Sequence, residues 1–147
     1  MSENNYRLYC FTNMYLSAIQ KGIQTAHVVS DISQYKQMNN VYVEWASSDK
    51  TIVVLEGGNQ KNLLSIALSI EEFNNDLHLN NLQQFPYALF REDEDSLNDA
   101  VTAVGIILPE SVYSLAKSIR EGVVPLETIP LLQQRFYSVL AYSRLAN

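Results

Sequence analysis

The chain has 147 residues, of which 47% are hydrophobic and 18% are charged. This length and balance are typical of one globular domain, because a core of this size buries roughly two-thirds of the surface of the unfolded chain. Sixteen acidic and ten basic residues leave a net charge of -6. Such a charge repels a polyanion unless the basic groups gather on one face, so the composition argues against a general nucleic-acid binder.

No apolar run approaches the ~20 residues that cross a membrane, and the start MSENNYRLYC lacks the basic and then apolar pattern of a secretory signal. We therefore expect a cytoplasmic protein without a membrane partner. The single cysteine, Cys10, lies in the apolar stretch YRLYCF and is expected to be a reduced core residue. With two distant histidines and this one cysteine, no metal site is expected, and no motif predicts a cofactor.

Residues 6–12 alternate and are rich in aromatic side chains, which predicts a first strand. Ser17 is a good N-cap for the helix that follows. Gly22 inside this helix costs about 1 kcal/mol relative to Ala, which suggests that something packs or binds closely there. One helical stripe is expected to face the core: Ile19, Ile23, Ala26, Val29 and Ile32.

The middle of the chain predicts a short helical or irregular piece at 41–46 and a strand at 51–55. The β-branched run of that strand is typical of a sheet covered on both faces. Asn59, after two glycines, is expected to cap a helix to Phe73, and His78 is expected in a loop or a short edge segment. The inward side of this helix is predicted to carry Leu63, Ile66, Ala67 and Ile70.

The second half predicts strands at 85–90 and 100–108, joined by a loop rich in acidic residues. Pro109 suits the first turn of a helix to about Glu121, which Gly122 closes. A final amphipathic helix is expected from Pro130. Its apolar side is predicted to carry Leu132, Phe136, Val139, Leu140 and Tyr142.

This order predicts one α/β domain over residues 1–147, with three layers (α/β/α) around a four-stranded mixed sheet. Residues 1–108 form its core and residues 109–147 a helical C-terminal extension. The apolar face of the extension either packs on the core of the same chain or joins copies into a symmetric dimer or tetramer. We expect a homo-oligomer assembled through these C-terminal helices.

Residues 6–108 resemble the type-2 peptidyl-tRNA hydrolases in several segments that occur in the same order. These are the strand that ends in Asn13, the helix segment QKGIQTAHVV, Trp45 ahead of TIVVLEG, and the strand AVTAVGIILPE. Gln24 to His27 look like the Gln-x-x-His portion of the first-helix pattern of the family. The resemblance implies that fold and an alternative function, cleavage of the ester between peptide and tRNA. Lys21 and His27 would then position and polarise the substrate, and Glu92 would activate water.

The chain departs from the family where that chemistry resides. The lysine position of the family is occupied by Gln20, and Lys21 is displaced by one residue, or about 100° of helix turn. The aspartate motif after the third strand is missing, and Glu92 in the acidic loop is the nearest substitute by position. We therefore expect a protein that is not an enzyme, and we keep the hydrolase as the alternative.

The expected function is the binding of a small nucleotide-like molecule. By position, Lys21 and Arg91 would pair with phosphates, Asn13 and Gln24 would bond a base or sugar, and Tyr142 would stack. The size and style of the chain are loosely similar to phage proteins that act as sponges for cyclic oligonucleotide immune signals such as cyclic GMP-AMP. Under that interpretation the protein is an anti-CBASS factor in the host cytoplasm.

Overall fold

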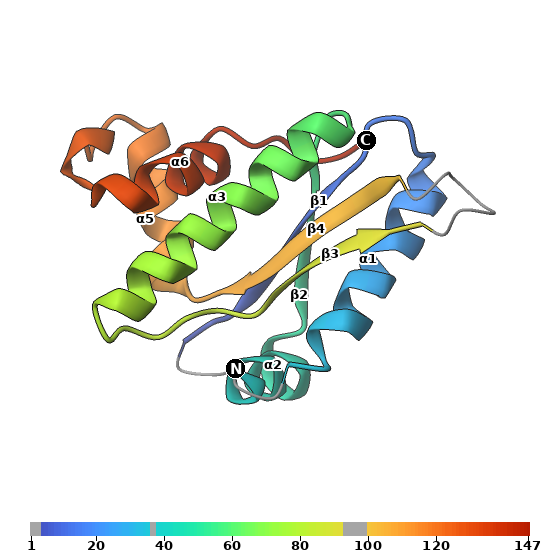
Figure 1. Ribbon diagram of the computed structural model, residues 1–147, viewed down its shortest axis with the longest axis horizontal. Helices are drawn as coiled ribbons and strands as arrows, with labels where there is room; N and C mark the ends of the chain where they lie inside the picture. The colour runs from blue at the N-terminus through green and yellow to red at the C-terminus, as the bar shows by residue number, and fades with distance from the viewer. Residues whose placement is uncertain (1–3, 36–37, 93–99) are drawn as a thin grey trace.

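The computed structural model describes residues 4–35, 38–92 and 100–147 (Figure 1). Within these ranges it is an α/β fold in which helices pack against one mixed sheet. The strands are β1 (Arg7–Thr12), β2 (Thr51–Glu56), β3 (Tyr87–Arg91) and β4 (Val101–Leu108). The helices are α1 (Ala18–Ile32), α2 (Asn39–Glu44), a π-helical turn (Trp45–Asp49), α3 (Gln60–Leu79), α5 (Glu110–Arg120), a 3-10 turn (Leu126–Thr128) and α6 (Leu131–Ala141).

The four strands lie in the order β2-β1-β4-β3. β1 is parallel to β2 and antiparallel to β4, and β3 is antiparallel to β4. The predicted four-stranded mixed sheet is therefore confirmed. Because β1, β2 and β3 run in the same direction, the loops that follow them meet at one edge of the sheet.

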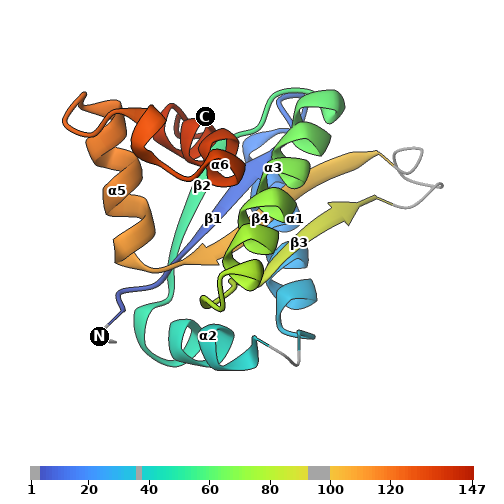
Figure 2. The ribbon, with the colours of Figure 1, turned by 60° about the vertical axis from the view of Figure 1, so that its left-hand side comes forward.

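Different helices cover the two faces of the sheet. Tyr9 and Cys10 are consecutive in β1, so their side chains lie on opposite faces. A Cβ added at Gly105 would meet Val28 of α1 and the sulfur of Cys10, so this face belongs to α1. The ring of Tyr9 lies 5.8 Å from that of Tyr113 in α5, on the opposite face. Figures 1 and 2 show α1 on one side of the sheet and α3, α5 and α6 on the other. Cys10 is fully buried and free, as predicted.

Strand β2 differs from its prediction, because its faces are not both covered. Thr51 and Ile52 are exposed, and in this strand only Leu55 is fully buried. The physical reason is position: β2 is an edge strand, and α1 packs mainly over β3 and β4. The free edge of β2 is instead paired with the end of the chain. The Glu56 amide donates to Arg144 O at 2.8 Å, and the Ala146 amide donates to Val54 O at 3.0 Å.

Helix α3 is longer than predicted and ends at Leu79 rather than Phe73. His78 lies in its last turn, so the loop or edge segment predicted for it is wrong. The helix continues because its later turns also have interior partners. The Asn74 side chain donates to the carbonyl of Phe85 and accepts from its amide, both at 2.9 Å. The Asn59 cap is confirmed by the bond from the Asn62 amide to its side chain.

Helix α1 begins at the predicted cap, where Ser17 and Gln20 form a reciprocal capping box. The predicted buried stripe is wrong for its first three members. Ile19, Ile23 and Ala26 are exposed, Val29 is half-buried, and Ile32 is buried. The helix instead buries Lys21, Gln24, Thr25 and Val28. Polar side chains face the sheet because they have partners there, as described below, and this turns the apolar stripe outward.

The C-terminal helices pack on the chain's own core. The ring of Phe136 in α6 lies 4.7 Å from that of Phe73 in α3, and α5 packs against α6. Leu132 and Tyr142 do not belong to this apolar side, since both are exposed. Pro109 precedes α5 as its N-cap rather than standing in its first turn, and Gly122 ends the helix with a φ of 77°, as predicted. Among the described helices none is long and apolar enough to cross a membrane.

Candidate functional site

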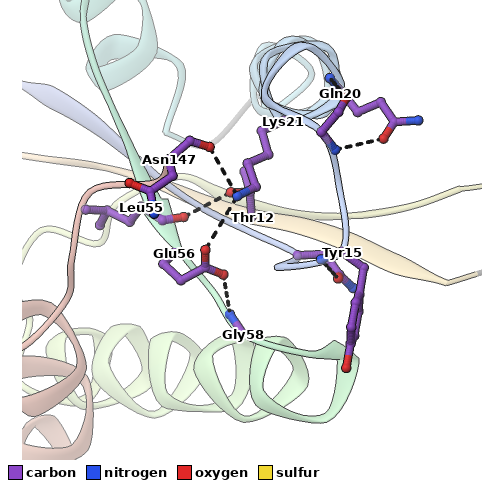
Figure 3. Close-up of polar contacts among 10 residues, drawn as sticks. Thr12, Tyr15, Gln20, Lys21, Leu55, Glu56, Gly58 and Asn147 are labelled. Atoms are coloured by element: carbon purple, nitrogen blue, oxygen red, sulfur yellow. Dashed lines mark hydrogen bonds and ion pairs between the residues drawn. The ribbon is translucent and has the colours of Figure 1, made fainter.

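Lys21 is held between the end of β2 and the end of the chain. Only 6% of the residue is exposed, and its ammonium donates to Glu56 Oε2 at 3.5 Å and to the main-chain oxygen of Asn147 at 3.5 Å. Glu56 uses its other oxygen to accept from the Gly58 amide at 3.1 Å (Figure 3). The ammonium is therefore neutralised inside the chain rather than presented to a ligand.

Gln24 lies one turn further along the same buried side of α1 and links the helix to the opposite edge of the sheet. Its amide nitrogen donates to Glu92 Oε2 at 3.0 Å, and its oxygen accepts from the Thr102 hydroxyl at 3.0 Å. Of the residues predicted for a hydrolase, Glu92 thus contacts Gln24, whereas Lys21 contacts Glu56. The two carboxylates approach α1 from strands at opposite edges of the sheet.

Asn13, in the loop after β1, also uses its side chain for hydrogen bonds within the chain. The Asn13 side chain donates to Val101 O at 3.1 Å and accepts from the Tyr15 amide at 3.0 Å. The glycine turn before α3 uses its amides in the same way, because the Gly57 amide donates to Thr12 O at 2.8 Å. These groups fix the edge of the sheet where β1 and β2 end.

The remaining predicted site residues, His27, Arg91 and Tyr142, are exposed. The ring of His27 is exposed and stacks on Phe90, with centroids 4.4 Å apart. Arg91 is exposed at the end of β3, and Tyr142 is exposed just after α6. Most of the acidic loop, residues 93–99, lies outside the described residues. The structure therefore buries Lys21 and Gln24 on one side of α1 and leaves Tyr142 exposed after α6.

A cavity of about 360 Å³ lies on the other face of the sheet, between β1, β2, α5 and the end of α6. Three basic residues line it: Arg7 from β1, and Lys117 and Arg120 from α5. Glu110 is the acidic residue in its lining, so three cations and one carboxylate give this hollow a local charge of +2 in a chain of -6. Such a site attracts a small anion while the rest of the surface repels a long one.

The guanidinium of Arg7 is positioned by aromatic groups in the cavity wall. It lies 4.2 Å from the ring centroid of Tyr113, within the range of a cation–π contact. A hydrogen bond to Tyr9 raises the pKa of Arg7 above its ordinary value, so the cation persists at all physiological pH. Burial raises the pKa of both Tyr9 and Tyr113, which keeps their hydroxyls neutral. The cavity therefore combines fixed positive charge with uncharged aromatic walls.

A second hollow of about 220 Å³ adjoins the first and shares Arg7, Glu110 and Tyr113 with it. Sequence reasoning missed this whole region, because Arg7 and α5 are about a hundred residues apart. The available signal was the three-residue spacing of Lys117 and Arg120, which places both on one face of a helix. Within the described ranges, no group of three or more His, Cys, Asp or Glu residues is arranged to hold a metal ion.

Comparison of the sequence with models of known protein families gives no match. Comparison with curated proteins gives none either.

Proposed function

We propose that this chain is a non-catalytic protein that binds a small nucleotide-like ligand in the basic cavity between β1, β2 and α5. The observation that carries the proposal is the convergence of Arg7, Lys117 and Arg120 on one hollow of an acidic chain. Cations in a concave site bind phosphate strongly, and Arg7 and Arg120 offer the forked geometry that phosphate prefers. Tyr9 and Tyr113 supply apolar walls beside the cations.

The cavity volume limits the ligand. Small-molecule sites span roughly 300–1,000 Å³, and about 360 Å³ is at the small end of that range. This size suits a single nucleotide unit rather than a length of nucleic acid. For a cyclic dinucleotide such as cyclic GMP-AMP, one nucleotide unit would enter the cavity and the other would remain outside. The proposal includes the sponge role, in which a phage protein sequesters such a signal without cleaving it.

The residues that the resemblance assigns to hydrolysis support the non-catalytic part of the proposal. A hydrolase requires a cation for the developing oxyanion and a base for water. Lys21 is buried against Glu56, and Glu92 accepts a hydrogen bond from Gln24. We also propose that the scaffold is that of the type-2 peptidyl-tRNA hydrolases; the mixed four-stranded sheet and the order of the matching segments support this.

The test is calorimetric titration with cyclic GMP-AMP, with GMP and AMP, and with inorganic phosphate. We expect saturable binding of at least one nucleotide, and recovery of the intact ligand by chromatography after heat denaturation. Replacing Lys117 and Arg120 together by Ala should weaken binding by roughly 30-fold or more, which corresponds to the loss of two charge-assisted contacts. The matched control is Lys61→Ala, which removes an exposed cation of α3 that does not line the cavity.

Two results would overturn the proposal. Binding that Lys61→Ala weakens as much as the double variant would show a diffuse charge effect rather than a site. Cleavage of peptidyl-tRNA at an enzyme-like rate, abolished by Lys21→Ala, would establish the alternative hydrolase function instead.

A further inference from the structure

The second hollow differs in charge from the basic cavity that it adjoins. One cation, Arg7, and two carboxylates, Asp49 and Glu110, line it, so its local charge is -1. Beyond the side chains that the two hollows share, the basic cavity carries Lys117 and Arg120. Together the hollows therefore have a positive end and a negative end. A ligand that filled both would carry an anion at one end and hydrogen-bond donors at the other.

Helix α5 contributes to both ends from one side of the helix. Its lining residues follow one another at intervals of three or four positions, so they share one stripe: Glu110, Tyr113, Lys117 and Arg120. Lys117 follows Glu110 by seven positions, which is about 10 Å along the helix axis. This length is similar to that of one extended nucleotide, from its phosphate to the far edge of its base.

Hydrogen bonds within the chain fix the acidic end of this site. The Asn5 side chain donates to Glu110 Oε2 at 3.0 Å, and the Tyr113 hydroxyl donates to Asn5 O at 2.6 Å. The Asp49 carboxylate accepts from the Tyr6 amide at 3.0 Å. These bonds hold the carboxylates in place before a ligand arrives, and groups that are already ordered cost less entropy on binding.

Glu110 has room to accept further hydrogen bonds. A carboxylate offers about four lone-pair sites on its two oxygens, and the bond from Asn5 uses one site on Oε2. The residue is exposed where it lines the second hollow. An ionised carboxylate only accepts, so its complement on a ligand is a pair of neighbouring donors.

Among the common bases, guanine has the edge that fits a carboxylate. Its N1–H and its 2-amino group are adjacent donors, so they can bond the two oxygens of one carboxylate together. Adenine and cytosine place a lone-pair nitrogen beside their amino group, and uracil places a carbonyl on each side of its N–H. The carboxylate would repel each of these acceptors.

We propose that the second hollow is the base subsite of the nucleotide site and that it selects guanine through the carboxylate of Glu110. The inference rests on the proposed function, because the phosphate of the same nucleotide would lie in the basic cavity against Lys117 and Arg120. The base would reach past Arg7, whose guanidinium lies over the ring of Tyr113. In cyclic GMP-AMP, the guanine unit would then be the one that enters the protein.

The charges of α5 also have a structural role, which the test must separate from base recognition. Glu110 lies in the first turn of α5, and Lys117 and Arg120 lie in the last, as the helix dipole favours. That role affects stability and predicts no preference among bases. Asp49 belongs to the π-helical turn before β2, so the dipole of α5 does not account for it.

The test is calorimetric titration of the full chain with GMP, AMP, inosine monophosphate and inorganic phosphate. We expect GMP to bind about 30-fold or more tightly than AMP, as the gain of two bonds to a charged group predicts. Inosine monophosphate lacks the 2-amino group but keeps N1–H, so its affinity should lie between the two.

Glu110→Gln removes the charge and keeps a carbonyl oxygen for Asn5. It should lower the ratio of GMP affinity to AMP affinity by about tenfold or more, because the new amide also donates, and glutamine pairs well with adenine. Inorganic phosphate should bind this variant at least as tightly as the wild type. The matched control is Glu127→Gln, which makes the same charge change at an exposed residue that lines neither hollow. The control should leave the ratio unchanged.

The outcomes separate the base subsite from the nucleotide site itself. Equal affinities for GMP and AMP, or a ratio that Glu110→Gln leaves unchanged, overturn the inference. If the Lys117 and Arg120 double variant still weakens both nucleotides, the proposed function stands without it. A ratio that Glu127→Gln lowers as much as Glu110→Gln shows an effect of net charge and also overturns the inference. Absence of binding by all three nucleotides overturns both proposals.

Discussion

The ammonium of Lys21 lies 3.5 Å from the carboxylate of Glu56, and it joins the first helix to the end of the edge strand β2. Glu56 is 35% exposed at its side chain, whereas Lys21 is almost completely buried. The cation therefore depends on this partner more than the carboxylate does. A residue that the sequence suggested for phosphate binding is used, in the structure, to connect α1 to the sheet.

Lys21→Met should consequently reduce the free energy of unfolding by about 1–2 kcal/mol, a value lowered by the solvent that reaches Glu56. Urea denaturation measures the loss. Glu56→Gln should cost more, because it leaves the buried ammonium without its carboxylate, and the double variant should cost less than the sum of the two, because the interaction is lost only once. Fully additive losses would contradict a coupled pair.

Gly57→Ala should be strongly destabilising. The added Cβ would lie 2.9 Å from the carbonyl oxygen of Thr12, a backbone atom in β1 that cannot move aside easily, and it would also clash with Leu63. We expect a loss of about 2–3 kcal/mol or more, measured by the shift of the urea midpoint. The control is Gly22→Ala, because a Cβ added at Gly22 meets no atom within 4 Å. Gly22→Ala should instead stabilise the chain by up to about 1 kcal/mol.

Removal of residues 144–147 should expose the edge of β2 and the Lys21 pair. The deletion removes the backbone bonds that join Arg144 and Ala146 to Glu56 and Val54. We expect faster amide exchange at Glu56 and stronger self-association, since an unpaired strand edge is a template for pairing. Hydrogen exchange detects the first effect and light scattering the second. Unchanged protection of the Glu56 amide would show that the pairing does not persist in solution.

The chain should lose stability as the pH rises above about 9. Burial raises the pKa of Cys10 from 9.0 to about 12, and burial also raises the pKa of Tyr137 from 10.0 to about 12. Between pH 9 and 12 the unfolded chain therefore releases protons that the folded chain retains, so the free energy of unfolding falls with increasing pH. Denaturation at a series of pH values from 8 to 11 checks this. Tyr137→Phe removes one of these groups and should flatten the decline above pH 10.

The residues that the sequence suggested for a hydrolytic site illustrate how a local pattern and a spatial arrangement differ. Gln24 to His27 occur in the expected order, yet Gln24 is buried between Thr102 and Glu92 while the His27 ring is exposed on Phe90. Spacing along one helix places residues on a side of that helix. It does not say which side the sheet will cover.

The sequence alone determined the strands, the helix caps and the mixed sheet, because alternation, capping residues and turn glycines act over a few neighbouring positions. Ser17, Asn59 and Gly122 end or begin helices as their local chemistry predicts. Only the tertiary structure decided the orientation of α1 and the basic cavity. The orientation of α1 depends on partners in the sheet, such as the Glu56 carboxylate that pairs with Lys21. The basic cavity depends on the approach of Arg7 to α5. Such contacts between residues distant in the chain leave no periodic signal, and their free energies outweighed the apolar pattern of the helix.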